Sequence, residues 1–564
     1  MIRLIFLLFF SIGFSQTYYV TTSGSSGNSG ANEANSWSLV HAFATATAGD
    51  IVYVKAGNYG ALELNSARAG TLANPIKFIG YTTTAGDILA TNGPTYTYAN
   101  WKANSDDLPD NVMPHLELNP TNNNPSANQH AFDIDHAYVE IHNFFISEYE
   151  MGVDITAANV TVNNVIGDQF GNWDANATGW DATIDSFQST NRDGTGIRIS
   201  SADNFTLTNN LMIDAGFVTY FIIGSDNGII SNCVGIAERS GNGADYVFDL
   251  YNSNDNVISN IYARRTYGTN SAGHRSRAIT TQGPNGSHRN TITGLVAENL
   301  RIQAEYSDNN IYTDVTMTTI NGGDGENDGS IQIGLDSNDN IFQNVSMDGG
   351  GGIQFLGYES GDGGATVTTA GSNNYFINFK IKNINSFNGH GLISLSRLGT
   401  SGVTGGTNYV VGMTADDFPW IINANRGGTI NFYNSSFSNG TQSSIDTFHP
   451  SFTDATDDYT ANYTNCNFNG NSFSTPSGTA ITTENPQLNS SLEPASNSAL
   501  IGAGVDPRTI STNADVDTAV MLDFLGNTRT IPVDIGAIEF GATSDDDDPV
   551  TAPSTSAFMF KRRN

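Results

Sequence analysis

The stretch Asn159-Val-Thr-Val-Asn-Asn-Val165 decides the fold, because variants of it return along most of the chain. Each copy has an Asn, a few residues that alternate between apolar and polar, and a second Asn followed by an apolar residue. Further copies are Asn204–Leu211, Asn256–Ile261, Asn340–Val345 and Asn374–Phe379. Repetition of this kind is typical of a solenoid, in which each unit stacks on its neighbours.

The second Asn of each copy, or a residue in its place, marks one turn of the predicted solenoid. This series consists of Asn143, Asn164, Asn210, Asn232, Asn260, Gly294, Asp314, Asn344, Asn378, Gly412, Asn434 and Asn465. Most steps are about 20 to 34 residues, which suits β-helix coils with loops of variable length. Asn tolerates a left-handed backbone, and its amide can hydrogen-bond to the Asn one coil away. We expect the series to be a structural ladder.

The composition of the repeats favours strands over helices. Val, Ile, Thr, Phe and Tyr alternate with polar residues, and Gly and Asn interrupt the pattern every few residues. The 564 residues include 59 Gly, and 38% of them are hydrophobic while 14% are charged. Such a composition can fill a narrow stacked interior with closely spaced turns. We therefore predict one long all-β domain of short, parallel, stacked strands.

Both ends of the chain differ from the repeats. Residues 1–16 combine Arg3, a short apolar run Leu4–Phe10 and small residues, which is the pattern of a secretory signal peptide. A buried core strand is the alternative, but export predicts a secreted protein (periplasmic, outer-surface or extracellular). No other apolar stretch approaches a membrane span. Residues 542–564 form an acidic and polar tail that we expect to be disordered.

Charge and cysteines exclude some functions. A net charge of −33 argues against binding to nucleic acid or to an anionic membrane, and we expect a monomer. Cys233 and Cys466 both follow the Asn of the series, about eight coils apart. At about 4.8 Å per coil they lie about 40 Å from each other, well beyond the limit of about 7 Å for a disulfide. We predict two free thiols in the core.

The ends of the repeat region carry a resemblance to a known superfamily. The opening Tyr19–Gly24, the segment Ala48–Tyr59, and the closing stretches Asp523–Arg529 and Val533–Glu539 accompany the Asn-containing coils. Together they resemble the secreted right-handed parallel β-helix proteins of the pectate-lyase-like superfamily, especially those of marine and gut Bacteroidetes. The resemblance covers about residues 17–541. It is specific for the fold, because these motifs accompany lyases, hydrolases and proteins without known chemistry alike.

This resemblance implies a single-stranded right-handed parallel β-helix with an N-terminal capping helix and a C-terminal closing segment. The amphipathic run Trp37–Ala46 follows Asn35-Ser36 and is the expected capped helix over the first coil. The region Asn485–Phe540 is expected to supply the terminal rungs and the closing segment.

In superfamily members that act on polysaccharides, the substrate usually crosses several strands of one parallel sheet. We therefore looked for outward polar residues in the middle coils, taking apolar positions such as Ile197, Leu250 and Ile333 as inward. The predicted outward residues are Arg198, Val247, Asp249, Ala278, Thr280, Gln332, Gln354 and Ser394. A slip of one residue would invert the assignment.

A cluster of basic residues stands out in this acidic chain. Between Ile261 and Arg301 lie Arg264, Arg265, Arg275, Arg277, Arg289 and Arg301, with His274 and His288, against the single acid Glu298. Arginines can bind carboxylated or sulfated sugars in bidentate fashion. The alternative is that they pair with acids on neighbouring coils and stabilise the solenoid, and Asp245 and Asp249 are candidates for such pairing.

The favoured function is a lyase that cleaves an acidic, uronate-containing polysaccharide by β-elimination. This reaction needs a group that neutralises the uronate carboxylate and a base that removes a proton. Related lyases use Ca²⁺, Arg or amide groups for the first task and Lys or Arg for the second. No Lys lies between Lys102 and Lys380, so the base would be Arg275, Arg277 or His274. The expected substrate-binding residues are Arg198, Arg264, Arg265, Thr280, Gln332 and Gln354.

Two alternatives and a calcium site remain open. A glycoside hydrolase of acidic or sulfated algal polysaccharide needs two carboxylates, for which Asp245 and Asp249 are the nearest pair, though about 13 Å apart along one strand. The third class is a non-catalytic glycan-binding or adhesive solenoid. Calcium could be bound by Asp245 and Asp249, or by Asp324, Glu326 and Asp328, which otherwise form an acidic turn. Trp173 and Trp180 could stack on a sugar ring.

Overall fold

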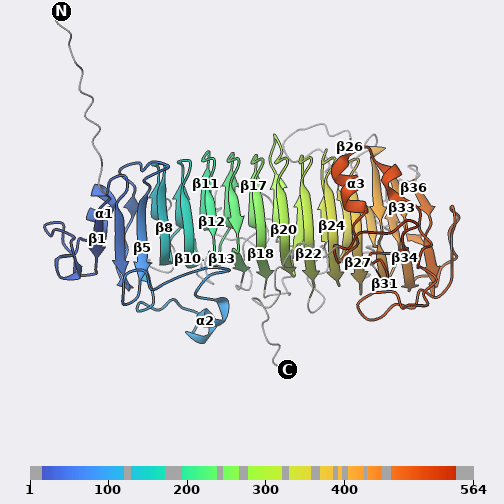
Figure 1. The fold of residues 1–564 in the computed structure, drawn as a ribbon, viewed down its shortest axis with the longest axis horizontal. Helices are drawn as coiled ribbons and strands as arrows, with labels where there is room; N and C mark the ends of the chain where they lie inside the picture. Colours follow the sequence, from blue (N-terminus) through green and yellow to red (C-terminus); the bar gives the residue numbers. More distant parts are fainter. Residues whose placement is uncertain are drawn as a thin grey trace, which may run out of the picture.

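The protein is an elongated stack of short parallel strands (Figure 1). The computed structural model describes residues 15–119, 129–171, 194–237, 246–265, 277–319, 330–356, 369–384, 391–396, 404–424, 428–447 and 459–541. Within these residues the strands form a first sheet of 22 strands and a second sheet of 13 strands, paired in parallel from coil to coil. The fold is a right-handed parallel β-helix, so the predicted fold class is confirmed.

The first sheet contains β1 (Thr17–Val20), β2 (Ile51–Lys55), β3 (Gly57–Asn58), β5 (Ile76–Tyr81), β6 (Pro114–Glu117), β8 (Val139–Ser147), β10 (Thr161–Phe170), β12 (Thr206–Thr208), β13 (Leu211–Ala215), β15 (Ile229–Ser231), β16 (Val234–Ala237), β18 (Val257–Arg265), β20 (Thr291–Glu298), β22 (Ile311–Thr318), β24 (Ile341–Asp348), β27 (Tyr375–Lys382), β30 (Thr407–Val411), β31 (Thr414–Phe418), β33 (Gly428–Tyr433), β34 (Ser436–Gly440), β36 (Tyr459–Thr464) and β37 (Asn467–Asn469). The second sheet contains β4 (Leu64–Asn65), β7 (His130–Ile134), β9 (Met151–Ile155), β11 (Thr195–Ser200), β14 (Val218–Ile223), β17 (Tyr246–Tyr251), β19 (Arg277–Gln282), β21 (Arg301–Ala304), β23 (Ser330–Ile333), β25 (Gly352–Leu356), β28 (Ile393–Ser396), β32 (Ile422–Ala424) and β35 (Asp446–Thr447). A separate pair joins β26 (Thr369–Ala370) to β29 (Thr404–Gly405), and the helices are η1 (Glu33–Asn35), α1 (Leu39–Thr45), α2 (Tyr98–Ala103), η4 (Pro507–Ile510) and α3 (Ala514–Val520).

The predicted Asn series lies at a bend of the first sheet, where the backbone is left-handed. The φ angle is 55° at Asn164, 57° at Asn378 and 73° at Gly294, which takes the place of Asn in its coil. One member of the series was wrong, because the pairing of β10 with β12 and β13 aligns Asn209, not Asn210, with Asn164. Two Asn stand side by side there, and only the register of the strands tells which one occupies the bend.

A second ladder runs inside the solenoid and is made by the first Asn of the later copies. Its members are Asn256, Asn290, Asn310, Asn340, Asn374 and Asn408, each at most 2% exposed. From coil to coil the side-chain Nδ2 donates to the Oδ1 of the next Asn at 3.0–3.1 Å. The same Oδ1 accepts the backbone N–H of the preceding Asn at 2.9–3.1 Å. This ladder therefore satisfies buried polar groups at every step.

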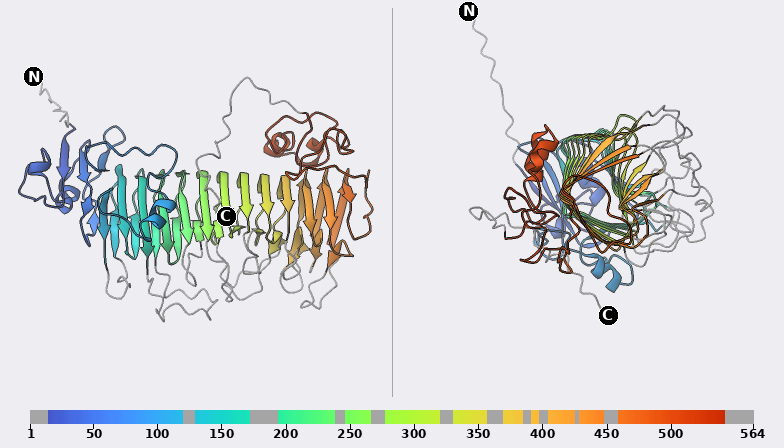
Figure 2. Two further views of the ribbon diagram at one scale, coloured as in Figure 1. Left: turned by 90° about the horizontal axis from the view of Figure 1, so that it is seen from below. Right: turned by 90° about the vertical axis from the view of Figure 1, so that its right-hand side faces the viewer.

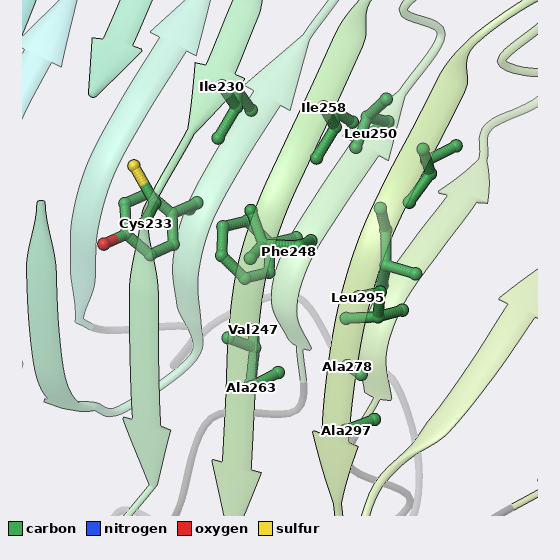
Figure 3. Close-up of a cluster of buried hydrophobic side chains, with 14 of the residues drawn as sticks. Ile230, Cys233, Val247, Phe248, Leu250, Ile258, Ala263, Ala278, Leu295 and Ala297 are labelled. Carbon is green, nitrogen blue, oxygen red and sulfur yellow. The ribbon is translucent and has the colours of Figure 1, made fainter. Parts of the chain in front are cut away.

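The interior between the sheets is apolar and close-packed. Tyr312 stacks on Phe342 at 4.4 Å between ring centroids, and Phe342 on Phe376 at 5.4 Å. Figure 3 shows Cys233 among the core side chains. Cys233 and Cys466 are both buried and free, as predicted, and burial raises the pKa of each thiol to about 12.

Helix α1 lies at the N-terminal end of the stack (Figure 1). The side chain of Ser38 caps it by accepting the backbone N–H of His41, so the expected helix is present but begins at Leu39. The Phe43 ring stacks on Phe78 at 3.8 Å and thus covers the apolar interior of the first coils. No helix in the described part of the chain is long and apolar enough to cross a membrane.

The region Asn485–Phe540 was predicted to supply terminal rungs and a closing segment, and the structure places it against the outside of the stack. Figure 2 shows α3 outside the tube of strands, and Val516 and Val520 of α3 pack with Ile377 of β27. The buried Arg529 donates from Nη2 to Asn378 Oδ1 at 2.9 Å. The outer side of the Asn bend therefore anchors residues 485–541, which add no parallel strand to either sheet among the described residues.

Candidate functional site

One row of side chains crosses the outer face of the second sheet from β4 to β32. In register order it consists of Asn65, Asp133, Asp154, Arg198, Phe221, Asp249, Thr280, Gln303, Gln332, Gln354, Ser394 and Asn423. We call this set the polar row, since Phe221 is its one apolar member. Apolar residues on either side of it, such as Ile197 and Ile199, lie in the core. The predicted outward residues Arg198, Asp249, Thr280, Gln332, Gln354 and Ser394 all lie in this row.

Val247 and Ala278 were predicted to face outward and instead lie in the core, as Figure 3 shows. Both are fully buried. The Val247 side chain fills the space opposite Gly235, where an added Cβ would meet it at 2.2 Å. Strict alternation fails because successive residues Val247 and Phe248 both belong to the core, and the pairing of β19 with β21 is irregular at the matching position.

The N-terminal part of the polar row gathers two carboxylates, a histidine and an arginine. Arg198 holds Asp154 with two hydrogen bonds, from Nε to Oδ1 at 2.8 Å and from Nη2 to Oδ2 at 2.7 Å. His130 Nδ1 lies 3.7 Å from Asp154 Oδ2. Burial and the neighbouring Asp154 raise the pKa of Asp133. Two neighbouring carboxyl groups thus differ in environment, because only Asp154 has a bidentate cationic partner.

Aromatic side chains lie beside the polar row near β14 and β17, and Phe221 is a member of the row. Phe217 and Tyr246 are buried, and their ring centroids lie 6.1 Å apart. Phe221 and Tyr251 are half-buried, with ring centroids 6.5 Å apart. We call these four residues the aromatic patch. Aromatic rings on an outer face can stack against the apolar face of a sugar ring.

Two arginines lie side by side next to the aromatic patch. The register pairs Arg277 of β19 with Arg301 of β21, and adjacent strands are about 4.8 Å apart. Their exposed fractions are 3% and 2%. The Arg277 guanidinium lies 4.5 Å from the centroid of the Tyr246 ring, and its Nε donates to Gln303 Oε1. The two arginines thus stand on neighbouring strands, and both are mostly desolvated.

The remaining predicted residues of the row have mostly structural contacts. The Nε2 of Gln282 donates to both carboxylate oxygens of Asp249, at 2.9 and 3.0 Å. Gln332 Nε2 donates to Gln354 Oε1 at 3.0 Å. Thr280 is fully buried, and its Oγ1 makes no hydrogen bond among the described residues. Within the described residues, the buried Thr280 Oγ1 thus has an unmet need for a hydrogen-bond partner.

The predicted arginine cluster is divided between the two sheets. Arg264 and Arg265 belong to β18 of the first sheet and do not join the polar row. Arg264 Nε lies 3.5 Å from Glu298, and its guanidinium lies 5.7 Å from the Tyr98 ring. Arg289 forms an exposed bidentate pair with Asp255. Pairing with acids, the alternative interpretation, thus describes Arg198, Arg264 and Arg289.

Several predicted residues lie outside the described residues, namely Asp245, His274, Arg275, Asp324, Glu326, Asp328, Trp173 and Trp180. Asp249 is the one described member of the predicted calcium ligands. A calcium ion takes six to eight oxygen ligands, and the Asp249 carboxylate is held by an amide N–H group on both oxygens. The described residues do not complete the predicted calcium site.

Asp133 and Asp154 were not predicted as site residues, although the sequence pattern around them indicates that they face outward. Each lies between two apolar residues, in Phe132-Asp133-Ile134 and Val153-Asp154-Ile155, as Arg198 does between Ile197 and Ile199. The triplet recurs because the strand presents one outward side chain between two core side chains. Extending the alternation towards the N-terminus would have placed all three in one row.

The comparisons with known proteins support the fold alone. No protein-family model and no curated protein matches the chain. Among solved structures it is similar to the pectate lyase Pel9A, with 12% identity, a TM-score of 0.28, and coverage of 94% of this chain and 97% of that one. It is also similar to a mannuronic acid specific family 6 polysaccharide lyase from human gut microbiota, with 11% identity, a TM-score of 0.43, and coverage of 74% of this chain and 86% of that one. A GH136 lacto-N-biosidase from Eubacterium ramulus is similar as well, with 11% identity, a TM-score of 0.38, and coverage of 83% of this chain and 68% of that one. These values say nothing about what this chain binds or cleaves.

Proposed function

We propose that the protein is a secreted lyase that cleaves an acidic, uronate-containing polysaccharide by β-elimination on the outer face of the second sheet. The observation that carries the proposal is the in-register pair Arg277 and Arg301 beside the aromatic patch. Two neighbouring cations on a chain of net charge −33 favour an anionic ligand. Because both guanidinium groups are nearly buried, a carboxylate that reaches them loses water and is bound more strongly.

The geometry favours a binding role for Arg277 over its predicted role as base. A guanidinium group keeps its proton in proteins, and that of Arg277 already contacts Gln303 and the Tyr246 ring. Held in this way, it suits neutralisation of the uronate carboxylate, which acidifies the proton to be removed. Because Arg275 keeps its proton for the same reason, His274 is the better of the two remaining predicted bases.

A glycoside hydrolase is the second candidate, and Asp133 with Asp154 favours it. Such an enzyme needs one protonated and one ionised carboxyl group. Burial and Asp154 raise the pKa of Asp133, whereas Arg198 holds Asp154 in a bidentate ion pair. Their nearest ligand atoms, together with one of His130, lie within 4.8 Å of one another. These two residues are a better pair than Asp245 and Asp249, which would lie far apart on one strand.

The test is to incubate the purified protein with alginate, pectate, chondroitin, ulvan and carrageenan, with and without a chelator. Ultraviolet absorbance of unsaturated uronate and reducing ends are recorded on the same samples. A lyase raises both signals, and a hydrolase raises reducing ends alone. Loss of the lyase signal in chelator would support a calcium requirement, and no signal on any polymer would refute both activities.

Two variants and a control place the activity. Arg277→Gln should lower lyase activity by at least about 100-fold, the scale for removal of one transition-state donor. Asp133→Asn should abolish a hydrolase activity and spare a lyase. Arg289→Gln, which removes an exposed arginine that is paired with Asp255 and is not a member of the polar row, should leave either activity within about two-fold. Full activity of Arg277→Gln would refute the assignment of the arginine pair.

A further inference from the structure

A hydrogen-bonded chain of Ser, His and Asp lies on the outer face of the first sheet. His115 of β6 is 1% exposed. Its Nε2 lies 2.8 Å from Ser147 Oγ, at the end of β8, and its Nδ1 lies 2.8 Å from Asp110 Oδ1. A hydroxyl, an imidazole and a carboxylate in this order form the arrangement that activates a serine nucleophile.

The fold holds these three residues from two sides. The pairing of β6 with β8 fixes His115 and Ser147, because Glu117 lies opposite Ser147 in the register. Asp110 is on the segment after α2, and Trp101 and Leu108 of this region belong to one apolar cluster with Phe145 of β8. Figure 1 shows α2 close to the strands β10 and β13 of the first sheet.

A fourth residue, Asp168 of β10, lies next to Ser147 in the register of the first sheet. It is 1% exposed, and its Oδ2 accepts the Trp101 indole N–H at 2.7 Å. Burial raises the pKa of Asp168 well above its usual value, and the nearby acids Asp107, Asp214 and Glu148 raise it further.

The Asp168 Oδ1 atom is buried and makes no hydrogen bond among the described residues. A neutral carboxylic acid has one O–H donor, and Oδ2 is already occupied by a donor from Trp101. The proton therefore belongs on Oδ1, where it has no acceptor. An unmatched buried donor beside a serine hydroxyl indicates a missing acceptor, and an ester carbonyl oxygen would supply it.

We propose that Ser147, His115, Asp110 and Asp168 form an esterase site for esters of small acyl groups, such as acetylated sugar hydroxyls. Ser147 Oγ attacks the ester carbonyl carbon while His115 Nε2 takes the Oγ proton. The Nδ1–H of His115 donates to Asp110, and the Oδ1–H of Asp168 donates to the carbonyl oxygen as negative charge develops there. The intermediate expels the alcohol, which leaves with the proton from His115.

Water completes the cycle by the same route. His115 Nε2 takes a proton from water, the hydroxide attacks the acyl-serine carbonyl, and Ser147 leaves with that proton as the free acid is released. Since Ser147 is 4% exposed, we limit the proposed substrate to esters of small acyl groups. The site is on the first sheet and does not depend on the polar row of the second.

A second group of the same residue types provides a matched control. Ser66 Oγ donates to Asp135 Oδ1 at 2.8 Å and lies 3.3 Å from His136 Nδ1. The same Nδ1 faces Asp135 Oδ1 at 2.6 Å. The Ser66 hydroxyl and the Asp135 carboxylate thus contact the same imidazole nitrogen. The ring does not lie between the two groups, so it cannot relay a proton from one to the other. Ser66 should have no nucleophilic character.

The test measures hydrolysis of p-nitrophenyl acetate and labelling by a fluorophosphonate, with peptide mass mapping of the adduct. We expect turnover above the uncatalysed rate and one adduct, on Ser147. Ser147→Ala should lower turnover by at least about 100-fold, and Ser66→Ala should leave it within about two-fold. Circular dichroism checks that each variant folds, and the adduct on the unmutated protein needs no variant at all.

Asp168 is tested by a pair of variants. Asp168→Ala removes the donor and should lower the turnover number by about 100-fold. Asp168→Asn supplies an amide N–H donor in place of the acid O–H and should retain most of the turnover. If Asp168 had a purely structural role, the turnover would not depend on whether the new side chain carries a donor. The proposal is overturned by absence of turnover and adduct in the unmutated protein, by an adduct elsewhere, or by full activity of Ser147→Ala.

Discussion

The internal Asn ladder leads to a quantitative prediction for Asn310. Its side chain takes part in four hydrogen bonds: it donates to Ser287 O and Asn340 Oδ1, and it accepts from the backbone N–H and the Nδ2 of Asn290. Asn310→Ala removes all four. Asn340 Oδ1 keeps the backbone donor of residue 310, and Asn290 Nδ2 keeps Ser253 O.

Two buried groups then have no other hydrogen-bond partner among the described residues: the backbone N–H of Asn290 and the carbonyl oxygen of Ser287. Each such group costs about 1 to 3 kcal/mol when it is left unsatisfied. The expected loss in the free energy of unfolding is therefore about 4 kcal/mol. Urea denaturation followed by far-ultraviolet circular dichroism measures it, and the urea midpoint gives the comparison if unfolding is not two-state.

The neighbouring Asn309 is the control. It is exposed and has a φ of 59°, a conformation that Gly adopts without strain. Asn309→Gly should change the free energy of unfolding by less than about 0.5 kcal/mol. A loss below about 1 kcal/mol for Asn310→Ala would mean that the ladder adds little beyond packing, and the reasoning from unsatisfied groups would be wrong.

Three further predictions concern buried groups elsewhere. Cys233 and Cys466 should not react with a thiol reagent at pH 8 in the folded protein, and both should react in denaturant, because burial raises each thiol pKa to about 12. For Asp168, whose pKa is higher in the folded than in the unfolded state, stability should fall as pH rises from about 4 through the folded pKa; Asp168→Asn should remove this slope in urea midpoints measured across that range. Arg529→Met should speed proteolysis within residues 485–541 before the strands are cut, since Arg529 is buried and joins this segment to Asn378; equal cleavage rates would show that the contact does not hold the segment.

The fold could be predicted because its main determinant is local. The spacing of Asn164 and its equivalents predicted the length of each coil. Each bend needs a residue with a left-handed backbone conformation, and Asn or Gly adopts it. The error at Asn210 and the errors at Val247 and Ala278 have one cause. A pattern of alternation gives the side of a residue only if the strand has no bend, and the bends depend on contacts between coils.

The site was harder to predict because its members meet through register and not through spacing. Arg277 and Arg264 are 13 residues apart in a basic stretch, yet one belongs to the second sheet and the other to the first. Conversely, Asp110 and Ser147 are distant in sequence and converge on His115. Composition drew attention to the arginines, whereas only the pairing of strands shows which arginine has which neighbour.

The covering of the first sheet bears on where a long polymer could bind. Helix α3 packs on the outer face of β27, and the segment around Trp101 packs on β8 and β10, so the chain itself occupies these parts of the first sheet. A polymer that crosses several coils needs a row of outward polar groups that is not used for such packing. Among the described residues the longest row of outward polar side chains is the polar row of the second sheet, in which Thr280, Gln332 and Gln354 are themselves at most 1% exposed. We assign polymer and acyl chemistry to different faces because the arginine pair belongs to the second sheet and the group of Ser147, His115 and Asp110 lies on the first.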